Sequence, residues 1–296
     1  MVAAVCGGLI FGIAYVKVRR VATAEALLAR FPAEDGMILA IDLESLRRTG
    51  ILAAFAGNKV AQEPEYRAFV GGTGFDYQQD LDLALAWFRQ GNTYLLLRGR
   101  FDWPRLRDYV AMQGGVCRNV FCRLEGSTPQ RKISFFPLSG NVMALAVSPD
   151  AWAASALAER RPAPPGTSYP SQPFWLLVPA SMLHDAGSLP AGVRPFSKAM
   201  SGAEKVVFSL APAGGRLEVQ VDVTCRSGQE AGVLASQLEG VTSLLNAMTA
   251  RQATKPDPKD LGGVLAAGRF EQVDQRVLGR WPIERSFLEA ILEGSQ

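Results

Sequence analysis

A proline-rich segment near the middle of the chain constrains the fold more than any other feature. Residues 160–173 (RRPAPPGTSYPSQP) contain five prolines in fourteen positions. Proline fixes φ and has no backbone N–H to donate, so this stretch can form neither a helix nor a central strand. It predicts an extended linker at 161–172, which separates a first half at 21–160 from a second half at 173–296.

Both halves show the same order of predicted elements, β-α-β-β-α-β-β-α. In the first half, Asp102 is a suitable N-cap for the helix that follows the central hairpin. In the second half, Ser227 and Glu230 have the spacing of a capping box at the start of a long helix. The repeated order predicts an internal duplication. The predicted strands and helices include 36–43, 81–88, 93–101, 102–109 and 152–159 in the first half, and 173–180, 205–211, 216–223, 227–248, 261–283 and 284–293 in the second.

The strand at 216–223 has the clearest alternation. Its apolar side chains Leu217, Val219, Val221 and Val223 are separated by polar ones, which predicts an antiparallel sheet covered by helices on one side. The runs LALAWF and FWLLV are apolar throughout and are expected to be covered on both sides. These patterns predict an α+β fold, an internally duplicated body of two antiparallel-sheet, ferredoxin-like halves.

The long helix of the second half carries an apolar stripe at helical spacing. Such a stripe is expected to face the core, the alternative being a groove for a partner. The stripe consists of Val233, Leu234, Leu238, Val241, Leu244, Leu245 and Met248.

The amino terminus begins with an uncharged apolar run. From Val2 to Val16 every residue is apolar or small, and Lys17, Arg19 and Arg20 follow at once. A helix needs about 20 residues to cross a bilayer, so this run is slightly short and relies on lysine and arginine to reach the interface. We expect an uncleaved single-pass membrane anchor at 1–20, in contact with membrane lipid. The alternatives are a cleaved signal, since ATA at 22–24 has the small-x-small form, and a buried core helix.

Small residues recur inside the predicted anchor. Gly8 and Gly12 form a G-x-x-x-G pair, and Ala4 extends the same spacing. Such a face lets two helices approach closely in lipid, so a homodimer through the anchor is one interpretation. The other is chance, because apolar segments rich in glycine and alanine often produce this spacing.

The net charge of +3 resides in the amino-terminal segment. The chain has 31 basic and 28 acidic residues, and residues 21–296 have 28 of each. A neutral body argues against a nucleic-acid partner, because displacing counterions requires a positive surface. The positive-inside rule places Lys17 to Arg20, and with them the body, in the cytoplasm. The opposite orientation requires basic residues ahead of Val2, which a translation start further upstream would supply.

Cys117 and Cys122 lie in GGVCRNVFCRLEG, which reads as a strand, a tight turn and a second strand. Cross-strand cysteines can meet disulfide geometry, and two ordinary buried thiols are the alternative. A C-x4-C pair with no second ligand pair and no nearby histidine is a poor zinc site. We expect the two cysteines to be oxidised and the body to be periplasmic, because disulfides persist in oxidising compartments.

Few residues are candidates for catalysis. His184 is the single histidine and follows Ser181 by three positions, but no G-x-S-x-G motif occurs, so an ordinary surface or capping histidine is expected. A cluster of acids at 63–82 has the residue type for glycosidase-type proton transfer or calcium binding, although helix capping and a solvated turn explain it more simply. Glycine motifs for nucleotides are missing as well. No catalytic residue, cofactor or metal is therefore predicted. The acids are Glu63, Glu65, Asp76, Asp80 and Asp82.

Four segments, EPEYRAFV, TGFDYQQDLD, RGRFDW and STPQRKISFFP, resemble those of a group of uncharacterised bacterial proteins with one N-terminal membrane segment. The similarity covers most of the chain after residue 20. It implies a membrane-attached bacterial protein and assigns neither an activity nor a site residue. In that group basic residues precede the apolar run, and this chain lacks them.

Three functions are compatible with these patterns. The first is a non-catalytic, membrane-anchored envelope protein that acts through contacts with another protein or with the envelope. The second is a binding module that holds an apolar or amphipathic small molecule in a cleft between the two halves. A filled interface between the halves favours the first, whereas a deep apolar cavity favours the second. A hydrolase that uses His184 or the acids at 63–82 is a distant third, because the catalytic motifs are missing; it requires those residues to share a pocket.

Overall fold

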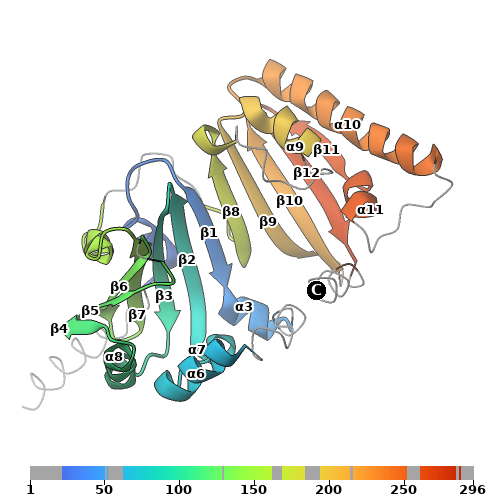
Figure 1. The fold of residues 1–296 in the computed structure, drawn as a ribbon. Coiled ribbons are helices and arrows are strands. Elements are labelled where there is room, and N and C mark those ends of the chain that lie inside the picture. Colours follow the sequence, from blue (N-terminus) through green and yellow to red (C-terminus); the bar gives the residue numbers. More distant parts are fainter. Residues whose placement is uncertain are drawn as a thin grey trace, which may run out of the picture.

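The strands of the protein form one antiparallel sheet. The computed structural model describes residues 22–50, 52, 63–128, 130–161, 169–183, 194–213, 216–251, 261–284 and 287. Within these ranges twelve strands are ordered β11-β12-β10-β9-β8-β1-β2-β3-β7-β6-β5-β4 (Figure 1). They are β1 (Met37–Asp42), β2 (Leu81–Arg89), β3 (Asn92–Gly99), β4 (Val116–Arg118), β5 (Phe121–Glu125), β6 (Lys132–Ser139), β7 (Val142–Ser148), β8 (Phe174–Pro179), β9 (Lys205–Ala213), β10 (Arg216–Thr224), β11 (Arg269–Val273) and β12 (Arg276–Ile283).

Helices connect the strands and cover the sheet, which makes the protein a mixed α and β structure. The α-helices in the described ranges are α2 (Ala24–Leu28), α3 (Leu43–Arg48), α6 (Pro64–Thr73), α7 (Tyr77–Asp80), α8 (Trp103–Met112), α9 (Arg194–Ala199), α10 (Gly228–Arg251) and α11 (Leu261–Ala266). The 3₁₀ segments are η1 (Ala153–Leu157), η2 (Ala180–Met182) and η3 (Met200–Gly202).

The two halves join edge to edge through β1 and β8, a ladder called the seam below. Residues 38–41 of β1 pair with residues 174–177 of β8, and the Asp42 N–H donates to the Pro173 carbonyl oxygen at 2.6 Å. The other edge of β1 pairs with β2, so no edge of β1 is left for a parallel partner. The ferredoxin-like layering predicted for each half is therefore not shown; the described strands form one continuous antiparallel sheet.

The hairpin predicted in the first half forms as β2 and β3. Gln90 and Gly91 in its turn have φ values of 44° and 79°, and two positive φ values are typical of the type I′ turn that joins twisted strands. The predicted N-cap of the next helix is confirmed, because Asp102 Oδ1 accepts a hydrogen bond from the Arg105 N–H at 3.1 Å.

The two faces of the sheet are covered differently. On one face, α8 packs on the first half and α9, α10 and α11 pack on the second half. On the other face, Leu27 and Leu28 of α2 pack with Leu85 and Leu96 of the first half. As predicted, β2 is covered on both sides. The second half of this face instead carries polar side chains, among them Lys205, Gln220, Asp222 and Arg276.

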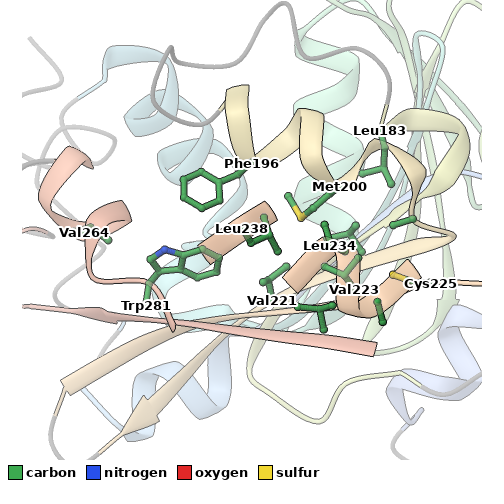
Figure 2. Close-up of a cluster of buried hydrophobic side chains, with 14 of the residues drawn as sticks. Leu183, Phe196, Met200, Val221, Val223, Cys225, Leu234, Leu238, Val264 and Trp281 are labelled. Atoms are coloured by element: carbon green, nitrogen blue, oxygen red, sulfur yellow. The ribbon is translucent and has the colours of Figure 1, made fainter. Parts of the chain in front are cut away.

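Helix α10 begins at the predicted capping box. Ser227 Oγ accepts from the Glu230 N–H, and Glu230 Oε2 accepts from the Arg226 N–H, both at 3.2 Å. Leu234 and Leu238 are buried against β10 and β12, as Figure 2 shows.

Only part of the predicted stripe on α10 is core. Leu234, Leu238, Val241 and Leu245 lie within about 60° of one another at 100° per residue; the first two are buried in the core cluster and the last two pack against it. Positions 233 and 244 lie about a quarter turn away from this line. The side chains of Val233, Leu244 and Met248 are 54%, 61% and 52% exposed.

Two predicted elements differ in type. The segment predicted as hairpin strands at 261–283 starts with the helix α11 before β11 and β12. The predicted helix at 152–159 is the shorter 3₁₀ segment η1. Among the described residues, no helix is both long and apolar enough to cross a bilayer. The predictions for the anchor at 1–20, most of the linker, His184 and the last helix concern residues outside the described ranges.

Candidate functional site

An apolar cavity of about 580 Å³ lies at the seam. The first half contributes Ile41, Leu43, Leu46, Leu52, Tyr77, Leu81 and Ala84 to its wall. The second half contributes Phe174, Phe208, Ser209, Leu210, Val219, Ile283 and Phe287. We call this space the junction cavity.

Strand register explains why one cavity takes residues from both halves. Ile41 of β1 lies opposite Ala84 of β2 on one side and Phe174 of β8 on the other. Phe174 in turn lies opposite Leu210 of β9, and Leu210 lies opposite Val219 of β10. Residues directly opposite in a ladder point to the same face. A row of side chains on one face of the sheet therefore crosses the seam and forms the floor of the cavity.

Helix α3 forms a wall of the cavity because the chain turns sharply after β1. Asp42 Oδ1 accepts from the Ser45 N–H at 2.9 Å, and Asp42 Oδ2 accepts from the Ser45 hydroxyl at 2.8 Å. This N-cap starts the helix directly at the end of the strand. Leu43 and Leu46, each 5% exposed, then line the cavity from α3.

Arg47 fastens α3 to the elements beside it. Its Nε donates to the Gln78 carbonyl oxygen at 2.9 Å, and its Nη2 donates to the Leu81 carbonyl oxygen at 2.6 Å. Its Nη1 also lies 3.6 Å from Asp82 Oδ1. The wall made by α3 is thus held to α7 and β2 by charge-assisted hydrogen bonds.

Tyr77 adds a phenol to a lining that is apolar apart from Ser209. Its hydroxyl oxygen accepts from Gln78 Nε2 at 3.3 Å, and no acceptor for its O–H is found among the described residues. The ring contacts Tyr66 edge to face, with centroids 5.5 Å apart. Burial and the hydrogen bond from Tyr66 to Asp76 raise the pKa of Tyr66, which stays a neutral donor beside the cavity.

The acids at 63–82 are used in structural contacts. Asp76 caps α7 by accepting from the Gln78 N–H at 2.9 Å, and Asp80 pairs with Arg100 at 2.9 Å. Asp82 pairs with Arg47, and Glu63 and Glu65 are exposed at the start of α6. Among the described residues, no three histidine, cysteine or acidic side chains are grouped for a metal ion. Ser181 is exposed on η2, and its predicted neighbour His184 lies outside the described ranges.

Among the described residues, the cysteines form one bonded pair and one buried thiol. Cys117 of β4 and Cys122 of β5 are cross-strand partners joined by a disulfide, with Cα atoms 4.0 Å apart. Cys225 is a free, buried thiol just before α10. Burial, followed by the charges of Glu230 and Glu204, raises the pKa of the Cys225 thiol.

The sequence does not indicate which residues line the junction cavity. The runs LALAWF and FWLLV, which the sequence predicts to be covered on both sides, supply Ala84 and Phe174. The pairing of β1 with β8, which brings these two residues together, leaves no local signal in the sequence.

Comparisons with known proteins bear on the fold. No protein-family model and no curated protein matches the chain. Crystal form III of a protein called TP0453 is similar with a TM-score of 0.52 at 8% identity, over 92% of this chain and 99% of that chain. Crystal form I of TP0453 gives a TM-score of 0.49 at 9% identity, over 93% of this chain and 98% of that chain. At this level of identity the likeness to form III concerns the fold alone.

Proposed function

We propose that the protein is a non-catalytic, membrane-anchored binding protein of the bacterial envelope, which holds one apolar or amphipathic small molecule in the junction cavity. The observation that carries this proposal is the cavity of about 580 Å³ at the seam, lined almost wholly by apolar side chains. An unfilled apolar junction favours a binding module over a protein that acts only through surface contacts.

The size and chemistry of the cavity suit an alkyl or acyl chain. Ligand pockets commonly measure about 300 to 1,000 Å³, and 580 Å³ lies inside that range. Burying about ten methylene groups at roughly 0.8 kcal/mol each supplies roughly 8 kcal/mol, the scale of a micromolar dissociation constant before the costs of association. We assign the Tyr77 O–H, which has no acceptor among the described residues, as the donor to an oxygen of a polar head group.

The same proposal includes the location of the protein in the cell. We place the anchor at 1–20, from Val2 through Lys17, Arg19 and Arg20, and the body in the periplasm. An oxidised Cys117–Cys122 pair supports an oxidising compartment. The resemblance to bacterial proteins with one N-terminal membrane segment agrees with this setting. Membrane lipid is the proposed partner of the anchor, and a homodimer through Gly8 and Gly12 remains a prediction.

We also infer an internal duplication from the order of strands on the two sides of the seam. Outward from the seam, the first half reads β1-β2-β3-β7-β6 and the second reads β8-β9-β10-β12-β11. In each half a helix follows the third of these strands, α8 in one and α10 in the other. The hairpin of β4 and β5 has no counterpart among the described strands of the second half.

A titration with a fluorescent fatty acid tests the binding proposal. The full-length protein, held in an amphipol, is expected to bind the probe saturably with one site per chain. Ala84→Phe projects a phenyl ring into the cavity and is expected to weaken binding by at least about tenfold, or roughly 1.4 kcal/mol. Ala158→Phe, at an exposed position outside the lining, is the matched control and keeps full binding. Equal affinities of wild type and Ala84→Phe would contradict the proposal.

A further inference from the structure

The free edge of the sheet at β4 exposes apolar side chains next to unpaired arginines. Val116 and Val120 are 51% and 56% exposed, and Trp152 is 44% exposed. Arg118 is exposed between the two valines, and the Arg123 guanidinium lies 4.1 Å from the centroid of the Trp152 ring. These five residues, Val116, Arg118, Val120, Arg123 and Trp152, are called the hairpin patch.

The hairpin patch is held rigidly. The Cys117–Cys122 disulfide joins β4 to β5, and the Cys122 side chain is buried. The Phe121 ring stacks on Trp152 at 5.1 Å, so the indole contacts both a phenyl ring and a guanidinium. These contacts hold the Trp152 ring in place while 44% of the residue stays exposed.

Charge distinguishes this edge from the rest of a neutral body. Residues 105–132 include six basic residues and two acidic ones. Among the described residues, Arg107, Arg118, Arg123 and Arg131 have no ion pair. Exposed valine and tryptophan surrounded by unpaired arginine match a membrane surface with anionic head groups, where apolar tips enter the interface and guanidinium groups meet phosphates.

The position of the chain's first described residue agrees with such a contact. The Ala22 carbonyl oxygen accepts from Arg98 Nη1 at 3.1 Å, and Arg98 pairs with Val142 at the start of β7. Phe121 stacks on Phe136 of β6, which pairs with Ala144, so the turn at 119–120 extends toward that same end of the sheet. Five residues, 17–21, span at most roughly 20 Å. A membrane segment that ends at Val16 therefore holds this end of the sheet near the bilayer.

We propose that the hairpin patch docks on the anionic phospholipid surface of the membrane that carries the anchor. The argument from the chain's start rests on the anchor of the proposed function, whereas the arguments from exposure and charge do not. The exposed side of α10 is a weaker candidate: Val233, Leu244 and Met248 lie on the same side as the exposed Glu230, whose carboxylate is repelled by anionic head groups.

Photocrosslinking in bilayers tests the docking. The full-length protein is placed in nanodiscs of phosphatidylcholine, with or without phosphatidylglycerol, and carries the substitution Val120→p-benzoylphenylalanine. We expect a phospholipid adduct that is far stronger in the discs with phosphatidylglycerol. Leu244→p-benzoylphenylalanine on α10 is the matched control and is expected to give no lipid adduct. Val116→p-benzoylphenylalanine serves as a second probe of the same patch.

Removal of two arginine charges from the hairpin patch is the second test of the docking proposal. With Arg118→Gln and Arg123→Gln added, the equilibrium constant for contact between the hairpin patch and the membrane is expected to fall roughly 30-fold. Each basic group near the surface contributes about 1 kcal/mol. Absence of a lipid adduct at positions 116 and 120, equal adducts at 120 and 244, or crosslinks to protein or nucleic acid instead would overturn the docking proposal. Loss of the protein from the discs indicates failure of the anchor, and the fatty-acid titration reports the cavity separately, so the three failures are distinguishable.

Discussion

At the scale of single residues, Arg47 determines how firmly α3 closes the junction cavity. Arg47→Met keeps the aliphatic stem but leaves the Gln78 and Leu81 carbonyl oxygens without their charged donor. We expect the free energy of unfolding to fall by about 2 kcal/mol. Urea denaturation measures the loss, with Arg48→Met as control because Arg48 is exposed and donates to the Ser45 hydroxyl. Equal losses in the two variants would contradict the role given to Arg47.

Cys225 gives the stability of the protein a dependence on pH. Because burial raises the pKa of its thiol, folding favours the neutral form. This contribution is complete below the unfolded thiol's pKa of roughly 8.5 and is lost as pH rises beyond it. The free energy of unfolding of the wild type, relative to Cys225→Ala, is expected to stay constant between about pH 6 and pH 8 and then to decline. A difference that stays flat to about pH 10 in urea titrations would show that the thiol does not titrate with folding.

At the scale of elements, the disulfide is the feature that stabilises the hairpin of β4 and β5. It closes a loop with a sequence separation of 5, and loop-closure entropy for so short a loop is about 2 kcal/mol. The double substitution Cys117→Ala and Cys122→Ala is expected to lower the free energy of unfolding by about that amount. Chemical denaturation of the two proteins gives the difference.

The oxidation state of Cys117 and Cys122 in cells indicates which compartment contains the body of the protein. After rapid acid trapping of cells and alkylation, Cys117 and Cys122 are expected to be protected as a disulfide. Recovery of both as alkylated thiols would contradict a periplasmic body.

Elements with strong local signals were predicted well. The N-caps at Asp102 and Ser227 and the turn that joins β2 and β3 are all encoded within a few residues, and the structure confirms them. The segment at 261–266 (LGGVLA) is predicted as part of a strand hairpin, whereas the structure has the helix α11 there. Its contacts with α10, including the hydrogen bond from Asn246 Nδ2 to the Ala266 carbonyl oxygen at 3.0 Å, accompany a helix instead. Such tertiary contacts are absent from a local pattern.

At the scale of the whole molecule, the seam makes the two halves depend on each other. Trp175 of β8 comes after the linker, yet it is 4% exposed and packs in the core of the first half beside Ala40. Its ring stacks on Tyr169 at 5.6 Å.

We therefore expect Trp175→Ala to cost about 3 to 5 kcal/mol, as large core truncations do. Hydrogen exchange is expected to accelerate in β3 and in β10 alike, because the sheet is continuous across the seam. Trp281→Ala, in the core of the second half, provides the comparison. Faster exchange confined to one half would indicate that the halves unfold independently.

The overall arrangement was only partly predictable. An antiparallel sheet with a one-sided second half follows from the alternation at Leu217 to Val223. The pairing of Ile41 with Phe174 joins residues more than a hundred positions apart. The local sequence of neither strand indicates which strand it pairs with. The junction cavity depends on that pairing, so its location between the halves could be anticipated while its lining could not.

We infer that the junction cavity holds a small amphiphile in the cell. Native mass spectrometry of the full-length protein purified from its own membranes tests this most directly, with Ala84→Phe prepared in parallel. We predict one bound amphiphile per wild-type chain, released on denaturation and identified in the organic extract, and none bound to Ala84→Phe. A wild-type chain that carries no small molecule and co-purifies only with another protein would contradict the claim.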